Sequence, residues 1–105
     1  MERSFHISRK AEEDILGCMR YLLQKDTNLP ARFLASFEET CKSLLDMPAL
    51  GKVRTFECTA LLNIREIPMR TFKKYLIFYR AHHEDIEIVR VIHGARDLPT
   101  IFVEG

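Results

Sequence analysis

The apolar residues near the amino terminus change from a period of two to a helical period. Polar and apolar side chains alternate over residues 3–8, which predicts a short strand. Apolar positions then recur at spacings of three and four up to Lys25, which predicts an amphipathic helix with Ser8 as its N-cap. Gly17 weakens this helix by about 1 kcal/mol relative to alanine, and close approach of a neighbouring helix would explain it.

A second apolar stripe follows a polar break at residues 25–28. This helix is predicted to begin near residues 29–30, since the proline there is tolerated in a first turn. It must end by Met47, because Pro48 disfavours helical conformation in the residue before it. The two helices should form an antiparallel hairpin, and the stripe is better explained as core than as a cofactor pocket. The stripe comprises Phe33, Leu34, Phe37, Cys41, Leu44 and Leu45.

The second half of the chain has the period of strands. A polar turn at residues 82–85 separates two β-branched and aromatic runs, which indicates a hairpin. Pro68 should end or bulge an earlier strand, because proline cannot donate to a ladder. The expected order is β-α-α-β-β-β, an α+β domain with an antiparallel sheet of about four strands and the helical hairpin on one face. After the helices, residues 54–58 are a candidate strand and residues 61–67 a better one, and they are followed by strands at residues 75–81 and 86–92.

Composition narrows the class of protein. A chain of 105 residues with 47% hydrophobic and 30% charged residues is an ordinary globular chain, large enough for one core. We therefore expect residues 1–105 to form a single domain, with no repeat or linker. No apolar run approaches the ~20 residues of a membrane span, and the first ten residues lack the apolar centre of a secretory signal. A cytoplasmic protein without membrane contact is expected.

Three cysteines, Cys18, Cys41 and Cys58, are widely spaced and odd in number. None of them belongs to a C-x-x-C or Cys/His pattern of the kind that binds zinc. Cys18 and Cys41 fall at apolar helical positions, where free cysteine behaves as a small core residue. We expect reduced thiols, and the sequence predicts neither a metal nor a cofactor.

The charges are unevenly distributed although the net charge is only +1. Residues 1–50 carry 7 basic and 8 acidic side chains, whereas residues 51–98 carry 9 basic and 6 acidic ones. This local excess is too small to identify a nucleic-acid-binding domain, and solubilising charge on an exposed sheet edge explains it equally well. Between residues 65 and 80 the only acid is Glu66, and the bases are Arg65, Arg70, Lys73, Lys74 and Arg80.

The last predicted strand closes on a compact polar group. Gly94 allows a sharp turn where His93, Arg96 and Asp97 are gathered, and strand packing alone requires no such cluster. The pattern Y-R-x-x-x-x-x-I-x-I-x-R-V-x-H-G-A-R-D resembles the end of bacterial toxins of the RelE/ParE superfamily, the ParE branch in particular. It is formed here by Tyr79, Arg80, Ile86, Ile88, Arg90, Val91, His93, Gly94, Ala95, Arg96 and Asp97.

The resemblance extends upstream and covers residues from about Phe5 to Leu98. Ala-Arg-Phe at residues 31–33, Met-Pro-x-x-Gly at residues 47–51 and Ile-Arg at residues 64–65 occur in the order seen in the family. Each motif alone is weak, but the ordered set is specific. The resemblance implies the same β-α-α-β-β-β fold that the periodicity predicts.

Relatives in this superfamily include enzymes that cleave messenger RNA on the ribosome, without a metal. The resemblance would give a ribonuclease role to His93, Arg96 and Arg65, since imidazole titrates near neutrality and cations stabilise the reacting phosphate. A turn histidine bonded to the backbone or to Asp97 is the simpler explanation of His93. Leu76 stands where an arginine is expected, and Phe102 where the family has a tyrosine. The ribonuclease set is therefore depleted.

The ParE branch is described as inhibiting DNA gyrase by binding, and the depleted set favours that branch. We expect a non-enzymatic gyrase inhibitor that makes no direct contact with nucleic acid; a RelE-like ribonuclease is the alternative. A third hypothesis is a non-toxic member that binds its antitoxin and helps to repress their operon. The candidate target-binding residues are Arg65, Arg80, Arg90 and Arg96, which carry charge and bidentate geometry.

Two of these arginines, Arg80 and Arg90, lie inside predicted strands and must each reach a sheet face or a carboxylate. Asp97 and Glu66 are candidate partners, so structural ion pairing competes with target contact. The resemblance also implies a cognate antitoxin, whose flexible segment could fold as a helix in an apolar groove or add a strand to the sheet. Exposed members of the set Phe33, Leu34 and Phe37, together with the run 100–103, are the predicted antitoxin contacts.

Overall fold

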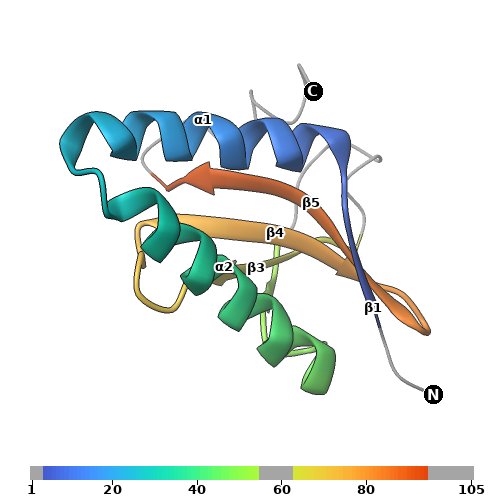
Figure 1. The fold of residues 1–105 in the computed structure, drawn as a ribbon. Coiled ribbons are helices and arrows are strands. Elements are labelled where there is room, and N and C mark those ends of the chain that lie inside the picture. The colour runs from blue at the N-terminus through green and yellow to red at the C-terminus, as the bar shows by residue number, and fades with distance from the viewer. Residues whose placement is uncertain (1–3, 55–62, 95–105) are drawn as a thin grey trace.

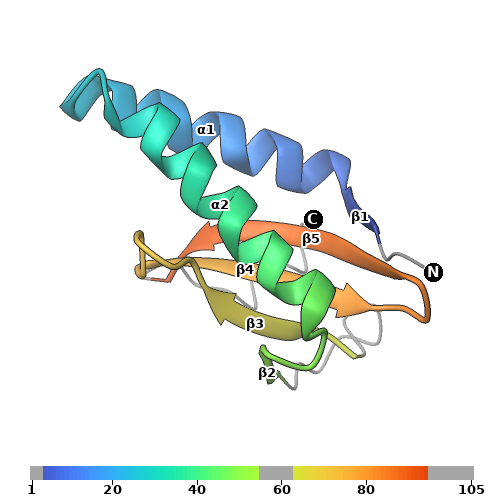
Figure 2. The ribbon, with the colours of Figure 1, turned by 60° about the horizontal axis from the view of Figure 1, so that its bottom comes forward.

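The computed structural model describes residues 4–54 and 63–94, which form two helices and a five-stranded sheet. Both helices lie on the same face of the sheet (Figures 1 and 2), which confirms the predicted α+β fold class. No helix within the described ranges is long and apolar enough to cross a bilayer. The elements are β1 (Ser4–Ile7), α1 (Arg9–Lys25), α2 (Leu29–Asp46), β2 (Lys52–Val53), β3 (Arg65–Pro68), β4 (Tyr75–Ala81) and β5 (Asp85–His93).

The strand order in the sheet is β1-β5-β4-β3-β2, and the sheet is mixed. Neighbours from β2 to β5 are antiparallel, as predicted, whereas β1 pairs with β5 in parallel, with Ser4 opposite Asp85. The parallel pairing and the fifth strand correct the antiparallel sheet of about four strands that the sequence predicted, because alternation along a single strand reveals its two faces but not the direction of its partner. The predicted strand 54–58 falls almost entirely outside the described residues.

The helix boundaries follow the local signals in the sequence. The Ser8 hydroxyl accepts a hydrogen bond from the Ala11 N–H at 3.0 Å, which is the predicted N-cap of α1, and donates to the Val89 carbonyl at 2.9 Å. Ser8 therefore also fixes the start of α1 against β5. Helix α2 has proline in its first turn and ends at Asp46, before Met47 and Pro48. Strand β3 ends at Pro68, also as predicted.

The main core lies between the helices and the sheet. Phe33 on α2 is fully buried and packs edge-to-face on Tyr75 and Phe72, with ring centroids 5.1 and 5.5 Å away. Phe78 alternates with the core residues of β4, so it points to the opposite face of the sheet, and it is also fully buried. The buried residues of the main core include Ala11, Ile15, Leu22, Phe33, Phe37, Cys41, Leu44, Ile77, Tyr79, Ile86, Ile88 and Val91.

Gly17 does not mark the close approach of a second helix, and that interpretation of the sequence is wrong. A Cβ built at Gly17 would have no neighbouring atom within 4 Å. Replacing Gly17 with alanine is therefore expected to stabilise the fold by about 0.5–1 kcal/mol through helix propensity. Urea denaturation would measure this gain, and a loss of stability in the variant would contradict the described packing.

The two described cysteines differ in accessibility. Burial raises the pKa of the Cys41 thiol to about 12, whereas Cys18 is half-buried at the surface of α1. Because the thiolate is the reactive form, iodoacetamide at pH 8 is expected to modify Cys18 and to spare Cys41 until the protein is unfolded in urea. Peptide mass spectrometry of the native and unfolded protein would check this. Equal labelling of both cysteines in the native state would contradict it. Cys58 lies outside the described residues.

Candidate functional site

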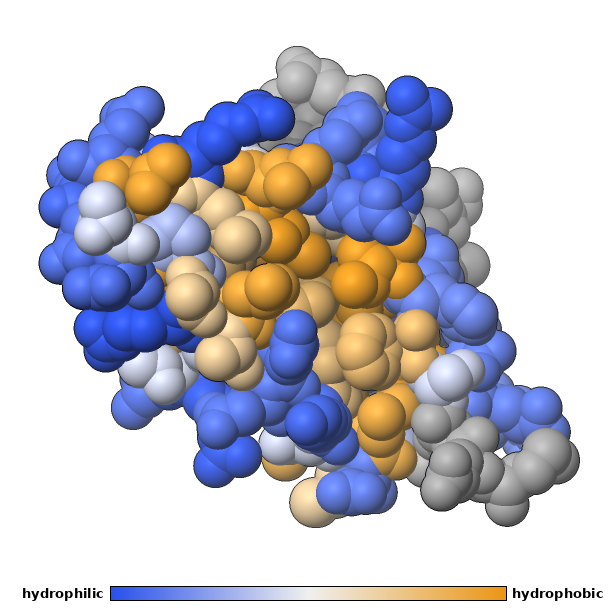
Figure 3. Space-filling view, viewed as in Figure 1, coloured by the Kyte–Doolittle hydropathy of each residue, from blue (hydrophilic) through white to orange (hydrophobic). Residues whose placement is uncertain are grey.

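An apolar groove of about 430 Å³ lies between α1, α2 and β1. In the space-filling view the hydrophobic side chains gather between the two helices and toward β1 (Figure 3). Leu16 on α1 is 53% exposed and Leu34 on α2 is 36% exposed, although both are large hydrophobic residues. Exposed apolar surface of this kind, bordered by charged residues, is typical of protein–protein contact sites. The groove is lined by Phe5, Ile7, Glu12, Ile15, Leu16, Leu34, Phe37, Glu38 and Lys42.

The three residues predicted to contact an antitoxin have different environments. Leu34 is exposed in the groove, and Phe37 lines the base of the groove while it is almost completely buried. Phe33 is fully buried on α2 and contributes to the core. Leu16, on the facing helix, was not singled out by the sequence, because its exposure depends on how α1 packs. The run 100–103 lies outside the described residues.

Arg65 on β3 holds the loop that follows α2. Its Nη1 donates to the Gly51 carbonyl at 2.8 Å. The hydroxyl of Tyr79 donates to the Pro48 carbonyl at 2.8 Å and accepts from the Gly51 N–H at 2.7 Å. Burial raises the pKa of the Tyr79 hydroxyl, which favours the protonated form that donates to the Pro48 carbonyl. A Cβ at Gly51 would meet the Tyr79 hydroxyl at 2.5 Å, which explains the glycine of the Met-Pro-x-x-Gly motif.

Arg90 on β5 binds Asp14 on α1 in a bidentate pair. Its Nε and Nη2 donate to the two carboxylate oxygens at 2.7 and 2.9 Å, and Asp14 also accepts the Val91 N–H at 3.0 Å. The side chains of this pair are only 11% and 12% exposed. The hydrogen bond to Asp14 raises the pKa of the Arg90 guanidinium. The pair fixes α1 to the edge of β5 that β1 leaves uncovered.

The described arginines are not gathered on one face. Arg80 on β4 pairs with Glu87 on β5 at 3.5 Å, whereas Arg65 on β3 donates to the Gly51 carbonyl in the loop after α2. Glu66, which the sequence offered as a partner for Arg80 or Arg90, is instead paired with Arg54. Glu66 is on β3, and Arg54 directly follows β2, the strand that pairs with β3. The two side chains therefore lie close together. Arg96 and Asp97 lie outside the described residues.

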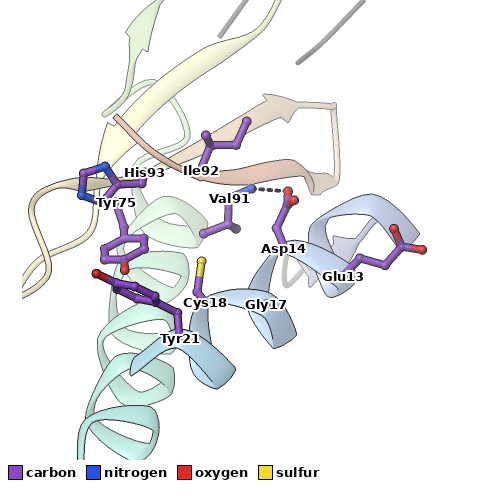
Figure 4. Close-up of a pocket in the computed structure, with 9 residues that line it drawn as sticks. All are labelled: Glu13, Asp14, Gly17, Cys18, Tyr21, Tyr75, Val91, Ile92 and His93. Carbon is purple, nitrogen blue, oxygen red and sulfur yellow. Dashed lines mark hydrogen bonds between the residues drawn. The ribbon is translucent and has the colours of Figure 1, made fainter. Parts of the chain in front are cut away.

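His93 ends β5 and borders a second cavity, of about 590 Å³, between α1 and β5. Its ring packs edge-to-face on Tyr75 with centroids 5.1 Å apart. In the close-up Tyr21 and Cys18 reach from α1 toward Tyr75, while Asp14 bonds to the backbone of Val91 farther along the strand (Figure 4). His93 is half-buried against an aromatic ring; no described cation lines this cavity, although His93 also borders a smaller pocket that Lys73 and Lys74 line. In the described ranges no His, Cys, Asp or Glu cluster could hold a metal ion.

Asp14 is the structural residue that sequence reasoning missed, and a signal for it existed. Ala11, Asp14, Ile15 and Cys18 follow the spacing of one helical face, so Asp14 is placed among apolar neighbours. A carboxylate at such a position requires a cationic partner. The partner, Arg90, is 76 residues away in sequence. Because of this separation, the pair could not be predicted from the sequence alone.

A family model described as the ParE toxin of type II toxin-antitoxin systems, parDE, matches residues 5–98 of the chain. The chain belongs to the ParE toxin family. A solved structure described as the chromosomal ParDE TA system from P. aeruginosa is similar to this ParE family member, with a TM-score of 0.69. The match covers 88% of this chain and 96% of that one at 17% sequence identity, so it demonstrates a shared fold. No curated protein matches this ParE family member.

Proposed function

We propose that this chain is the toxin of a type II toxin-antitoxin module, that it inhibits DNA gyrase by binding, and that a cognate antitoxin neutralises it. The observation that carries the proposal is the family match over residues 5–98, which spans both helices and the whole described sheet. The resemblance to the ParE branch supplies gyrase as the target.

Binding rather than RNA cleavage is supported by the state of the residues that a ribonuclease would use. Leu76 occupies the position where RelE-like enzymes have an arginine, and Phe102 replaces their tyrosine. Arg65, the upstream base of that set, already donates to the carbonyl of Gly51. A guanidinium engaged in the loop has less freedom to stabilise a reacting phosphate. On this proposal Arg65 holds the loop.

The arginines that do not hold this loop are the remaining candidates for contact with the target. Arg90 is engaged by Asp14 in a nearly buried pair and stabilises the fold. Arg80 is paired with Glu87 at the longer distance of 3.5 Å. We therefore keep Arg80 and Arg96 as the arginines proposed to contact gyrase.

The antitoxin is proposed to occupy the groove between α1, α2 and β1 with the apolar face of a helix. An amphipathic helix in a groove buries side chains at spacings of three and four, and Leu16 and Leu34 supply exposed apolar partners on the two walls. Phe37 at the base of the groove gives the rigid aromatic surface against which such side chains pack.

Inducible expression without antitoxin tests the proposal in cells. Incorporation of labelled thymidine and labelled methionine would be followed side by side after induction. A fall in thymidine incorporation before methionine incorporation is expected if gyrase is the target. An earlier fall in methionine incorporation, with discrete cuts in transcripts, would replace the proposal by the ribonuclease alternative. Unchanged growth would favour the third hypothesis, a non-toxic binder of the antitoxin.

One observation favours the ribonuclease alternative. His93 borders a small pocket together with Lys73 and Lys74, which places a titratable ring beside two cations. Under that alternative, His93→Gln would abolish cleavage and toxicity. Under the gyrase proposal His93 has no catalytic step, and the same variant should keep the ability to inhibit supercoiling.

A further inference from the structure

The loop between β3 and β4, residues 69–74, has a fixed backbone. The Met69 N–H donates to the Tyr75 carbonyl and the Tyr75 N–H donates to the Phe72 carbonyl, each at 2.9 Å. The Gly94 N–H donates to the Lys74 carbonyl at 2.7 Å, which ties the end of the loop to the end of β5. The loop lies at the end of the sheet nearer the turn between α1 and α2 (Figures 1 and 2).

Two buried hydroxyls on α2 anchor the same loop. The Arg70 N–H donates to Thr40 Oγ1 and the Thr71 N–H donates to Ser36 Oγ, both at 3.2 Å. Ser36 and Thr40 are the buried polar residues of the described chain, 3% and 1% exposed. Polar groups are buried at a cost unless they are hydrogen-bonded, so their role here is to accept from this loop.

The anchored loop presents cations that no described carboxylate neutralises. Arg70, Lys73 and Lys74 are exposed, and none of them forms an ion pair with a carboxylate of the described residues. Two arginines of the sheet behave differently, since Arg80 and Arg90 each have an acidic partner. The opposite end of the sheet, at the β4–β5 turn, carries acidic residues at positions 84, 85 and 87. Positive charge therefore gathers at the β3–β4 loop and negative charge at the β4–β5 turn, at opposite ends of the strands.

A small pocket of about 360 Å³ opens between this loop and the end of β5. Its lining residues carry two ammonium groups, two hydroxyls and an imidazole, and none of the described residues that line it is a carboxylate. Phe72 is half-buried and packs on Phe33 and Tyr75, so the pocket has a rigid aromatic wall. The lining residues are Thr71, Phe72, Lys73, Lys74, Tyr75 and His93.

We propose that the β3–β4 loop, through Lys73, Lys74 and the pocket they share with His93, binds phosphates of the DNA backbone. The choice of DNA rests on the proposed function, in which the target is an enzyme that acts on DNA. Lysine ammonium groups are compact point charges suited to phosphate oxygens, and backbone contacts of this kind give affinity without sequence preference. This inference replaces the expectation from the sequence that the protein avoids direct contact with nucleic acid.

The fixed backbone makes the proposal physically favourable. A cation on a mobile loop loses conformational entropy when it binds, whereas residues 69–74 are already ordered by five hydrogen bonds to β4, β5 and α2. The remaining cost is the ordering of two lysine side chains. Release of counterions from the DNA offsets that cost, which makes the interaction dependent on salt.

Fluorescence anisotropy with a labelled duplex of random sequence tests the proposal on the full chain. The variant Lys73→Gln/Lys74→Gln would be compared with the matched control Lys10→Gln/Lys52→Gln, which removes the same charge from exposed positions on α1 and β2. Wild-type protein is expected to bind more weakly as salt rises. Loss of two phosphate contacts should lower the slope of log K against log salt by about 1.8, and the control should keep the wild-type slope.

Three results would overturn the inference. These are no binding of duplex by the wild-type protein, equal slopes in the two variants, and a preference for single-stranded RNA over DNA that depends on Lys73 and Lys74. Gyrase supercoiling assays with the same proteins separate this inference from the proposed function. If wild type inhibits gyrase while the anisotropy gives one of these three results, the DNA contact is wrong and the proposed function stands. If wild type leaves gyrase unaffected, the proposed function fails, whatever the anisotropy shows.

Discussion

Replacing Asp14 with alanine is expected to lower the free energy of unfolding by about 3–5 kcal/mol. The substitution leaves the Arg90 guanidinium nearly buried without its bidentate partner and removes the acceptor of the Val91 N–H. Loss of the bidentate partner of a nearly buried guanidinium and an unsatisfied backbone donor both destabilise the folded state. Urea denaturation followed by circular dichroism would measure the change in the midpoint.

The neighbouring carboxylate provides a matched control. Glu13 is on the same helix, its side chain is 57% exposed, and its pair with Arg9 is at 3.7 Å. Glu13→Ala is therefore expected to change stability by no more than about 0.5 kcal/mol. If Asp14→Ala and Glu13→Ala have the same effect, the buried pair does not hold α1 to β5. The double variant Asp14→Leu/Arg90→Met should recover most of the loss, because two apolar residues leave no unpaired charge.

The second large effect is expected at the groove, where Leu16→Asp should weaken antitoxin binding. Leu16 is an exposed apolar wall of the groove, and a carboxylate there would lose its hydration against the apolar face of the partner. A loss of at least about 2 kcal/mol is expected, which is roughly 30-fold in Kd. Isothermal titration of the variant with the antitoxin encoded beside its gene would measure it.

Leu23→Asp is the control for this experiment. Leu23 is on the same helix and is 53% exposed, as Leu16 is, but it does not line the groove. Both variants should keep the wild-type free energy of unfolding within about 0.5 kcal/mol, because both positions are exposed. Wild-type affinity in the Leu16 variant, or an equal loss in both variants, would place the antitoxin elsewhere on the surface.

Local features of the fold could be predicted because each has a local cause. Ser8 caps α1 through its own side chain, and Pro48 limits α2 through sterics with the residue before it. Strand β4 is visible in the sequence as a short apolar and aromatic run that ends at a polar turn, a pattern that fits a buried strand. The class of fold and the order of its elements follow from such signals.

Features that depend on distant residues could not be predicted in the same way. The parallel pairing of β1 with β5 joins residues about 81 positions apart, such as Ser4 and Asp85. The role of Arg65 was also hidden, since its acceptor, the carbonyl of Gly51, is placed by the loop after α2. Only the fold showed that Arg65 and Arg90 hold neighbouring elements in place. Of the four candidate arginines, Arg80 and Arg96 are therefore the ones proposed to contact the target.

The proposed function is tested most directly with purified gyrase. Supercoiling of relaxed plasmid would be followed while the purified protein is added, first alone and then after incubation with its antitoxin. The account predicts inhibition by the free protein, relief by the antitoxin, and no cleavage of added messenger RNA by the same preparation. Full supercoiling at protein concentrations well above that of gyrase, with the antitoxin-binding activity intact, would contradict it.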